Sequence, residues 1–113
     1  MAPPKQRKTQ RTVTFEVKTS KSLPVGQQVF IAGGAKVLGN WRPDGLPLTR
    51  MGENVWSGYA ILPVGDSVEY KITLGSWDNE ALDEGGVTPG NFGLKPGGDI
   101  TVRHTVSAWK SDR

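Results

Sequence analysis

Alternating apolar and polar residues predict a series of short β-strands along this chain. In residues 12–18, Val13, Phe15 and Val17 fall on one face, while the polar residues between them fall on the other. Residues 67–74 repeat this alternation. Each of these two segments is therefore predicted to be a strand with one buried face. Less regular apolar runs predict further strands at residues 27–33, 47–49, 55–62 and 99–109.

Burial can be predicted in more detail for two of these strands. Residues 55–62 carry apolar side chains at most positions, so both of their faces are expected to be covered. The last strand alternates, and its inward face is expected to hold Ile100, Val102, His104 and Val106. His104 is the only histidine of the chain, and its position favours a partly buried residue of a sheet over a catalytic base.

Turn-forming residues separate the predicted strands, at residues 23–26, 51–54 and 63–66. No window of the sequence combines a helical period with capping residues. Strands that recur with turns between them are typical of an antiparallel β-sandwich or barrel. The pattern therefore predicts an all-β fold.

One long segment, residues 75–98, departs from this pattern because it holds seven glycines and two prolines. A loop of this length is uncommon in a compact domain and is usually functional. A short strand pairing around residues 91–94, Asn-Phe-Gly-Leu, is expected to interrupt it.

Length and composition limit the class of protein. The chain has 113 residues, which fits a single domain. It has no cysteine, which excludes a disulfide framework and a thiolate metal site. Since no apolar run approaches the ~18 residues that a membrane-spanning helix needs, no membrane partner is expected.

The net charge of +3 is unevenly distributed. Four basic residues give the first eleven positions a charge of +4, so the remaining chain carries −1. We expect three parts: a disordered basic leader at residues 1–11, a folded domain at residues 12–110 and a tail at residues 111–113. The near-neutral domain argues against a nucleic-acid partner, because strand binding needs a positive groove.

The sequence does not decide the cellular compartment of the protein. The leader lacks the apolar stretch of a secretory signal. Two interpretations fit, a cytoplasmic protein or a module taken from a larger, secreted enzyme.

The sequence offers no set of residues for catalysis. Four acidic residues lie together in the long loop, and a carboxylate pair among them could serve glycoside hydrolysis: Asp78, Glu80, Asp83 and Glu84. Catalytic carboxylates need rigid and different environments, so we interpret these as solvated charges or as hydrogen-bond acceptors for a ligand. They also lack the ligand spacing of a calcium loop. We expect no enzyme activity, no metal and no cofactor.

The four tryptophans fall into two groups. Trp56 lies within a predicted strand and Trp109 ends one, so both are expected in the core or at its rim. Trp41 and Trp77 lie in loops, each shortly after a strand. Two exposed indoles provide flat surfaces for the apolar face of a sugar ring or for an unstacked base. The near-neutral charge of the domain favours the sugar.

Several short motifs, taken in order, carry a resemblance to a known family. They are Val-Thr-Phe-Glu-Val at 13–17, Gly-Gln-Gln-Val-Phe-Ile-Ala-Gly at 26–33, Leu-Gly-Asn-Trp at 38–41, Pro-Leu-Thr at 47–49, Trp56, residues 62–72, Asn91 and residues 100–109. Together they resemble a starch-binding domain, carbohydrate-binding module family twenty, with features of the related glycogen-binding family forty-eight. The resemblance implies an immunoglobulin-like antiparallel β-sandwich of about seven strands.

The resemblance also implies sugar-binding roles for four residues. Trp41 matches one half of the family's first sugar platform. Trp77 follows the Glu-Tyr-Lys motif at a spacing similar to the glycogen-binding pattern, in which a tryptophan completes the platform. Lys71 matches a lysine that hydrogen-bonds sugar hydroxyls. Asn91 matches an asparagine at the platform, although Phe92 stands where the family usually has arginine.

A second sugar site of the family is not expected. Its usual tyrosine is replaced by Val25, and the loop that carries another tyrosine is reduced to residues 51–54.

We therefore predict a non-catalytic module that binds α-glucan, such as starch, glycogen or malto-oligosaccharides, by aromatic stacking. A covalently attached catalytic domain is a further partner that the resemblance allows. The alternative is a sandwich module that has lost sugar affinity and acts as a spacer or docking domain of an attached hydrolase or esterase.

Overall fold

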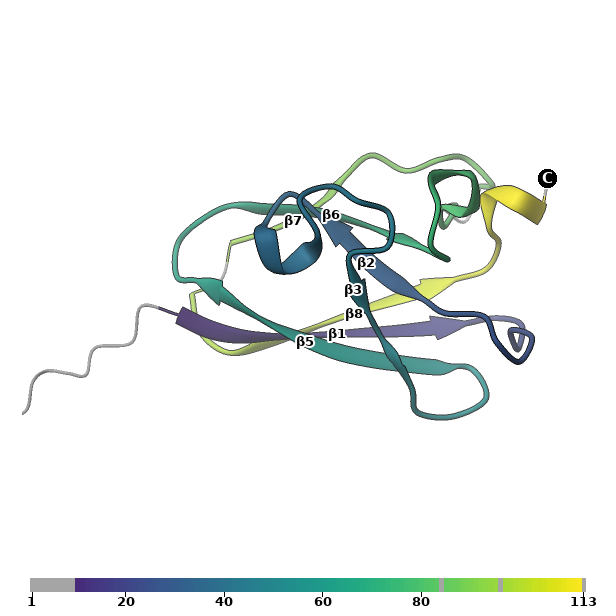
Figure 1. Cartoon of the computed structure of the whole chain (residues 1–113), viewed down its shortest axis with the longest axis horizontal. Helices are drawn as coiled ribbons and strands as arrows, with labels where there is room; N and C mark the ends of the chain where they lie inside the picture. The colour runs from purple at the N-terminus through teal and green to yellow at the C-terminus, as the bar shows by residue number, and fades with distance from the viewer. Residues whose placement is uncertain (1–9, 84, 96, 113) are drawn as a thin grey trace, which may run out of the picture.

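The computed structural model describes residues 10–83, 85–95 and 97–112, which fold into two four-stranded sheets packed face to face. Figure 1 shows β1, β5 and β8 in one layer and β2, β6 and β7 in the other. This arrangement confirms the predicted β-sandwich.

The first sheet has the order β4-β5-β1-β8. β1 runs antiparallel to β5, with Phe15 opposite Gly58, and parallel to β8, with Phe15 opposite Val102. The strands of this sheet are β1 (Gln10–Thr19), β4 (Thr49–Arg50), β5 (Val55–Pro63) and β8 (Ile100–Val106).

The second sheet has the order β3-β2-β6-β7 and is antiparallel throughout. Its strands are β2 (Phe30–Gly33), β3 (Leu46–Pro47), β6 (Val68–Thr73) and β7 (Phe92–Leu94). Three 3-10 turns complete the described part of the chain: η1 (Lys36–Leu38), η2 (Trp77–Asn79) and η3 (Lys110–Asp112). Among the described residues, no helix has the length and apolar character needed to cross a membrane.

The core lies between the sheets and is formed by the inward residues that the alternation predicts. Val13, Phe15 and Val17 of β1 are fully buried, and Tyr70 and Ile72 of β6 meet them from the other sheet. Trp56 and Trp109 are also buried, as their positions predict. Burying apolar surface in this way is the main force that holds the two layers together.

Two predictions about burial are wrong. The outward face of β5 is not covered, since Tyr59 is 63% exposed and Ile61 is 40% exposed. Ile100, expected inside, is 45% exposed at the first position of β8. In both cases the sheet turns the side chain to solvent, and a β-branched or aromatic residue there satisfies strand propensity without being buried.

Some boundaries also differ from the prediction. β1 begins at Gln10, so the last two residues of the predicted leader, Gln10 and Arg11, belong to the sheet. The rest of that leader lies outside the described residues. The apolar run at 27–33 forms a strand only from Phe30 onward. The expected short strand at 47–49 is two strands, β3 and β4, which belong to different sheets.

The segment 75–98 is more ordered than its glycine content predicts. Glu80 forms a β-bridge with Thr73, and Ala81 forms one with Trp109. β7 pairs with β6, which confirms the expected pairing around residues 91–94. These contacts hold the segment along the edge of the second sheet.

His104 lies in an aromatic cluster between β6, β7 and β8. Its Nε2 is 2.7 Å from the hydroxyl of Tyr70, and its ring centroid is 4.5 Å from that of Phe92. Burial raises the pKa of Tyr70 to about 12 and lowers the pKa of His104 below its ordinary value. The expectation of a partly buried sheet residue is confirmed.

Candidate functional site

Trp41 is placed by an unusual turn that follows β2. After η1, the backbone takes the left-handed conformation at three consecutive residues, with φ of 93° at Gly39, 52° at Asn40 and 67° at Trp41. This region suits glycine and asparagine but is unfavourable for a bulky residue such as tryptophan. The Trp41 amide donates a 2.7 Å hydrogen bond to the carbonyl of Gly33, which closes the turn on the end of β2.

Trp77 is placed by the turn that follows β6. Gly75 has φ of 114°, a conformation that favours glycine, and the chain then enters η2 at Trp77. The fully buried Thr73 connects this turn to the other one. Its hydroxyl donates to the carbonyl of Pro43 at 2.6 Å and accepts from the Gly75 amide at 3.0 Å. Thr73 therefore fixes the two tryptophan-bearing loops to one another.

The two indoles come from turns at opposite ends of the antiparallel β2–β6 pair and meet beside Lys71, on the outward face of β6. Their ring centroids lie 6.5 Å apart and their planes are inclined by 44°. Trp41 is 38% exposed and Trp77 is partly exposed. They border a groove of about 320 Å³ together with Lys71, Glu80 and Asn91. This platform groove brings together all four residues that the sequence singled out.

Lys71 reaches the platform groove from β6 and is held in place on two sides. Its Nζ forms an ion pair with the carboxylate of Glu80 and donates a 2.9 Å hydrogen bond to the carbonyl of Pro89. An ammonium has three N–H donors, and among the described residues only Glu80 and Pro89 accept from this one, so a third donor can meet a ligand in the groove.

Glu80 differs from the interpretation as a solvated loop charge. It is only 4% exposed, because the bridge to Thr73 turns its side chain toward Lys71. The opposite charges of Lys71 and Glu80 were the one feature of the sequence that could have indicated this ion pair. The contact itself depends on the path of the loop, which the sequence does not show. Asp83 has a structural role, since its Oδ1 accepts from the amides of Gly85 and Val87 at 2.9 Å each.

Of the remaining members of the acidic group, Asp78 is exposed in η2. Glu84 lies outside the described residues. Among the residues that the structure describes, no cluster of three or more metal-ligating side chains occurs.

Asn91 is exposed at the rim of the platform groove, just before β7. Its Nδ2 donates a 3.0 Å hydrogen bond to Oε1 of Glu69. That bond fixes the orientation of the amide, and since no donor in the described part of the chain pairs with its Oδ1, this oxygen can accept from a ligand.

The surface around Val25, where the resemblance would put a second sugar site, differs from the platform groove. Val25 is 99% exposed and borders a cavity that also includes Arg50 and Trp56. The Trp56 ring is buried, and the Arg50 guanidinium lies 5.3 Å from its centroid. The aromatic ring at this end of the molecule is therefore covered by a cation.

Comparisons with known proteins identify the family of the chain. Residues 10–86 match the family described as the starch binding domain. An alpha-amylase of Niallia circulans is 36% identical over 100 residues, which are 88% of this chain and 8% of that protein. A glycerophosphocholine phosphodiesterase of Rattus norvegicus is 37% identical over 70 residues, which are 59% of this chain and 10% of that protein. The chain thus spans at most a tenth of these relatives.

Solved structures show the same fold. A glucoamylase from Hypocrea jecorina aligns with a TM-score of 0.66 and 27% identity over 89% of this chain and 18% of that chain. The family 20 module of a maltotetraose-forming amylase from Pseudomonas saccharophila aligns with a TM-score of 0.61 and 22% identity over 83% of this chain and 98% of that chain. Since the family match covers more than half of the chain, this chain belongs to the starch-binding domain family and is a non-catalytic carbohydrate-binding module.

Proposed function

We propose that the platform groove binds an α-glucan by stacking glucose rings on Trp41 and Trp77. The observation that supports this is the pair of partly exposed indoles, 6.5 Å apart and inclined by 44°, brought together from two separate loops. The apolar C–H face of a sugar ring packs against an aromatic face. Two inclined faces suit two glucose rings that are turned relative to each other, as they are in a curved α-1,4-linked chain.

In this proposal Lys71 and Asn91 bind the hydroxyl groups at the edge of the stacked rings. Both side chains are oriented by protein contacts, Lys71 by Glu80 and Pro89, and Asn91 by Glu69. Groups that are already ordered lose little conformational entropy when a ligand arrives, which favours binding. The contact of Lys71 with Glu80 makes Glu80 a positioning residue in this proposal.

The expected affinity is modest. Stacking contributes about 1–3 kcal/mol per aromatic, by analogy with bases on aromatic side chains. Each hydrogen bond to a hydroxyl replaces one to water and contributes about 0.5–1.5 kcal/mol. After the cost of association, a dissociation constant of roughly 10 μM to 1 mM is expected.

Titration calorimetry with β-cyclodextrin tests the proposal. Trp41→Ala and Trp77→Ala should each weaken binding about tenfold or more, because each removes one stacking surface. Their thermal midpoints should stay near that of the wild type, because both rings are partly exposed. Tyr59→Ala is the matched control, since it removes an exposed aromatic ring on the outward face of β5.

Two results would contradict the proposal. Wild-type affinity in both tryptophan variants would show that the sugar binds elsewhere. No binding by the wild type would favour the alternative, a sandwich that has lost sugar affinity and serves as a spacer or docking domain.

We also propose that the module acts next to an attached catalytic domain. The support is that the chain spans 8% of the alpha-amylase and 10% of the phosphodiesterase to which it is similar. In such an arrangement the module would raise the local concentration of polysaccharide around the catalytic domain.

A further inference from the structure

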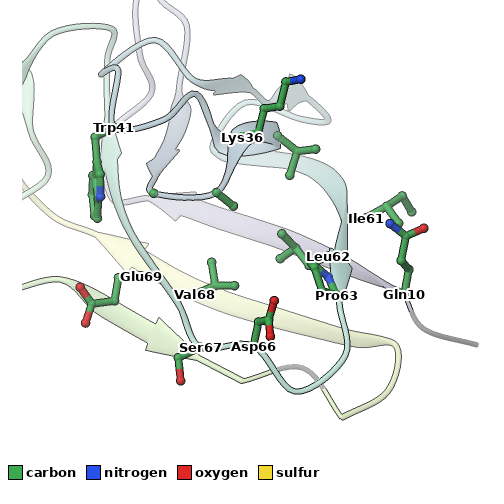
Figure 2. Close-up of a pocket in the computed structure, with 13 residues that line it drawn as sticks. Gln10, Lys36, Trp41, Ile61, Leu62, Pro63, Asp66, Ser67, Val68 and Glu69 are labelled. Atoms are coloured by element: carbon green, nitrogen blue, oxygen red, sulfur yellow. The ribbon is translucent and has the colours of Figure 1, made fainter.

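A second and larger groove lies behind Trp41, between η1, the end of β5 and the start of β6. Its volume is about 670 Å³, within the range of roughly 300–1,000 Å³ that is typical of sites for small ligands. Figure 2 shows Trp41 at one end of this rear groove and Gln10, Ile61 and Pro63 at the other.

The rear groove has an apolar lining that is open to solvent. Val37 of η1 is 48% exposed and Ile61 of β5 is 40% exposed, and both border the groove together with Trp41. Exposed apolar side chains gathered around one concave surface indicate a surface that contacts another molecule.

Polar groups interrupt this lining. Asp66, Ser67 and Glu69 border one long side, and the carboxylate of Asp66 points toward the middle of the groove (Figure 2). Gln10 adds an amide that donates hydrogen bonds at the far end of the groove. Aliphatic faces next to both donors and acceptors match glucose, whose ring has apolar faces and whose hydroxyls both donate and accept.

The rear groove adjoins the platform groove at two residues. Trp41 borders both grooves. Glu69 borders the rear groove and accepts the hydrogen bond from Asn91, which borders the platform groove. A chain that leaves the platform past Trp41 therefore meets the rear groove directly.

We propose that the rear groove binds further glucose units of the same α-glucan chain that stacks on Trp41 and Trp77. This inference rests on the proposed function of the platform. The glucose rings lie against Val37 and Ile61, and their hydroxyls donate to the carboxylate of Asp66. The module thereby distinguishes long linear chains from short or cyclic ones.

Calorimetric titration with a linear and a cyclic sugar tests this assignment. Maltodecaose is long enough to leave the platform, whereas β-cyclodextrin is a closed ring that has no free chain end to extend into the rear groove. Val37→Arg places a long side chain at the groove, and should weaken maltodecaose binding about tenfold while leaving β-cyclodextrin binding unchanged. Asp66→Ala should weaken maltodecaose binding about threefold, as expected for one lost hydrogen bond.

Ile100→Arg is the matched control, because Ile100 is 45% exposed and borders neither groove. It introduces the same charge as Val37→Arg at similar exposure, and should leave both affinities at the wild-type value. A long chain can also bind the platform in several registers, which raises its apparent affinity. That gain is the same in all variants, so a change in the ratio of maltodecaose affinity to β-cyclodextrin affinity reports on the rear groove alone.

The outcomes separate this inference from the function on which it rests. The ratio of maltodecaose affinity to β-cyclodextrin affinity is the quantity to compare. If it is the same in the wild type, Val37→Arg and Asp66→Ala, and β-cyclodextrin still binds, the glucan site in the rear groove is overturned while the platform site stands. Failure of the wild type to bind either sugar would overturn the proposed function and this inference with it. Sedimentation shows whether a second copy of the chain occupies the groove. Self-association that Val37→Arg abolishes would also overturn the assignment to glucan.

Discussion

Trp41 shows how a single residue is held in an unfavourable conformation at the site. A residue in a sparsely populated backbone region costs about 1–3 kcal/mol and persists only where its surroundings fix it. Here the Gly33 carbonyl accepts from the Trp41 amide, and the Ala35 carbonyl accepts from the Asn40 amide at 3.2 Å. Such strain is found mostly at functional sites, which agrees with a role for this indole in binding.

Gly34→Ala should weaken sugar binding without removing any aromatic ring. A Cβ at this position would lie 2.9 Å from Nε1 of Trp41, so the indole has to move away from its place beside Trp77. We expect β-cyclodextrin affinity to fall about tenfold, measured by calorimetry, because misplacing one stack loses most of its contribution.

Gly52→Ala is the control for this substitution, because its Cβ would meet no atom within 4 Å. It should bind sugar like the wild type. Unchanged affinity in Gly34→Ala would show that the position of the Trp41 ring does not matter for binding.

His104 gives a pH dependence of stability at the scale of one residue. Burial lowers its pKa in the folded state, so between that value and the ordinary value of about 6.5 the unfolded state binds more protons. The free energy of unfolding should therefore be highest above pH of about 6.5 and fall as the pH drops through this window. Urea unfolding at a series of pH values measures it.

His104→Gln should remove this part of the pH dependence, because glutamine does not titrate. The comparison with the wild type separates His104 from the carboxylates, which titrate in both proteins. An identical slope in the two proteins would mean that His104 is as easily protonated in the folded state as in the unfolded one.

At the scale of elements, the Lys71–Glu80 pair ties β6 to the segment that carries Trp77 and Asn91. The side chains of Lys71 and Glu80 are 17% and 6% exposed, and Lys71 also reaches the carbonyl of Pro89. One lysine therefore fixes two parts of a glycine-rich segment on the sheet edge. Burying charges is costly, so the pair must stay intact to be tolerated.

Glu80→Gln should lower the free energy of unfolding by about 3 kcal/mol, because it leaves a largely buried ammonium without its counter-charge. Chemical denaturation measures the change. Asp44→Asn breaks the exposed pair between Arg42 and Asp44, whose side chains are 73% and 46% exposed. This control should change stability by less than about 1 kcal/mol. Equal effects of the two substitutions would show that burial of the Lys71–Glu80 pair contributes nothing.

The strands could be predicted from the sequence where one face is buried, because burial imposes the period of two on β1 and β6. The exposure of Tyr59 and Ile61 could not be predicted, since apolar residues on an open sheet face look the same in sequence as buried ones. The residues of the platform groove could be singled out as loop tryptophans and through a resemblance. The roles of Thr73 and Glu80 could not, because each depends on a contact between loops.

At the scale of the whole molecule, two regions of the surface differ in what they offer to a sugar. The platform groove has two partly exposed indoles, whereas at the Val25 end of the sandwich the Trp56 ring is buried beneath Arg50. A sugar site needs a flat apolar surface that is accessible. The described residues provide that surface at the platform groove, and Val25 provides no ring at its own end of the sandwich.

Titration calorimetry with β-cyclodextrin should therefore fit one ligand per chain. Arg50 is held over Trp56 by hydrogen bonds to the carbonyls of Leu23 and Glu53, at 3.0 and 2.9 Å, so uncovering that ring for a second sugar would break both.

Val25→Tyr tests the same argument by adding a ring where the wild type has none. Val25 is exposed, so the substitution should fold normally and add an accessible ring, creating weak binding at this end that persists when Trp41 is replaced by alanine. The opposite result would be two sugars bound per wild-type chain and one per chain in Trp41→Ala. It would show that the Val25 end already binds sugar by groups other than an exposed ring.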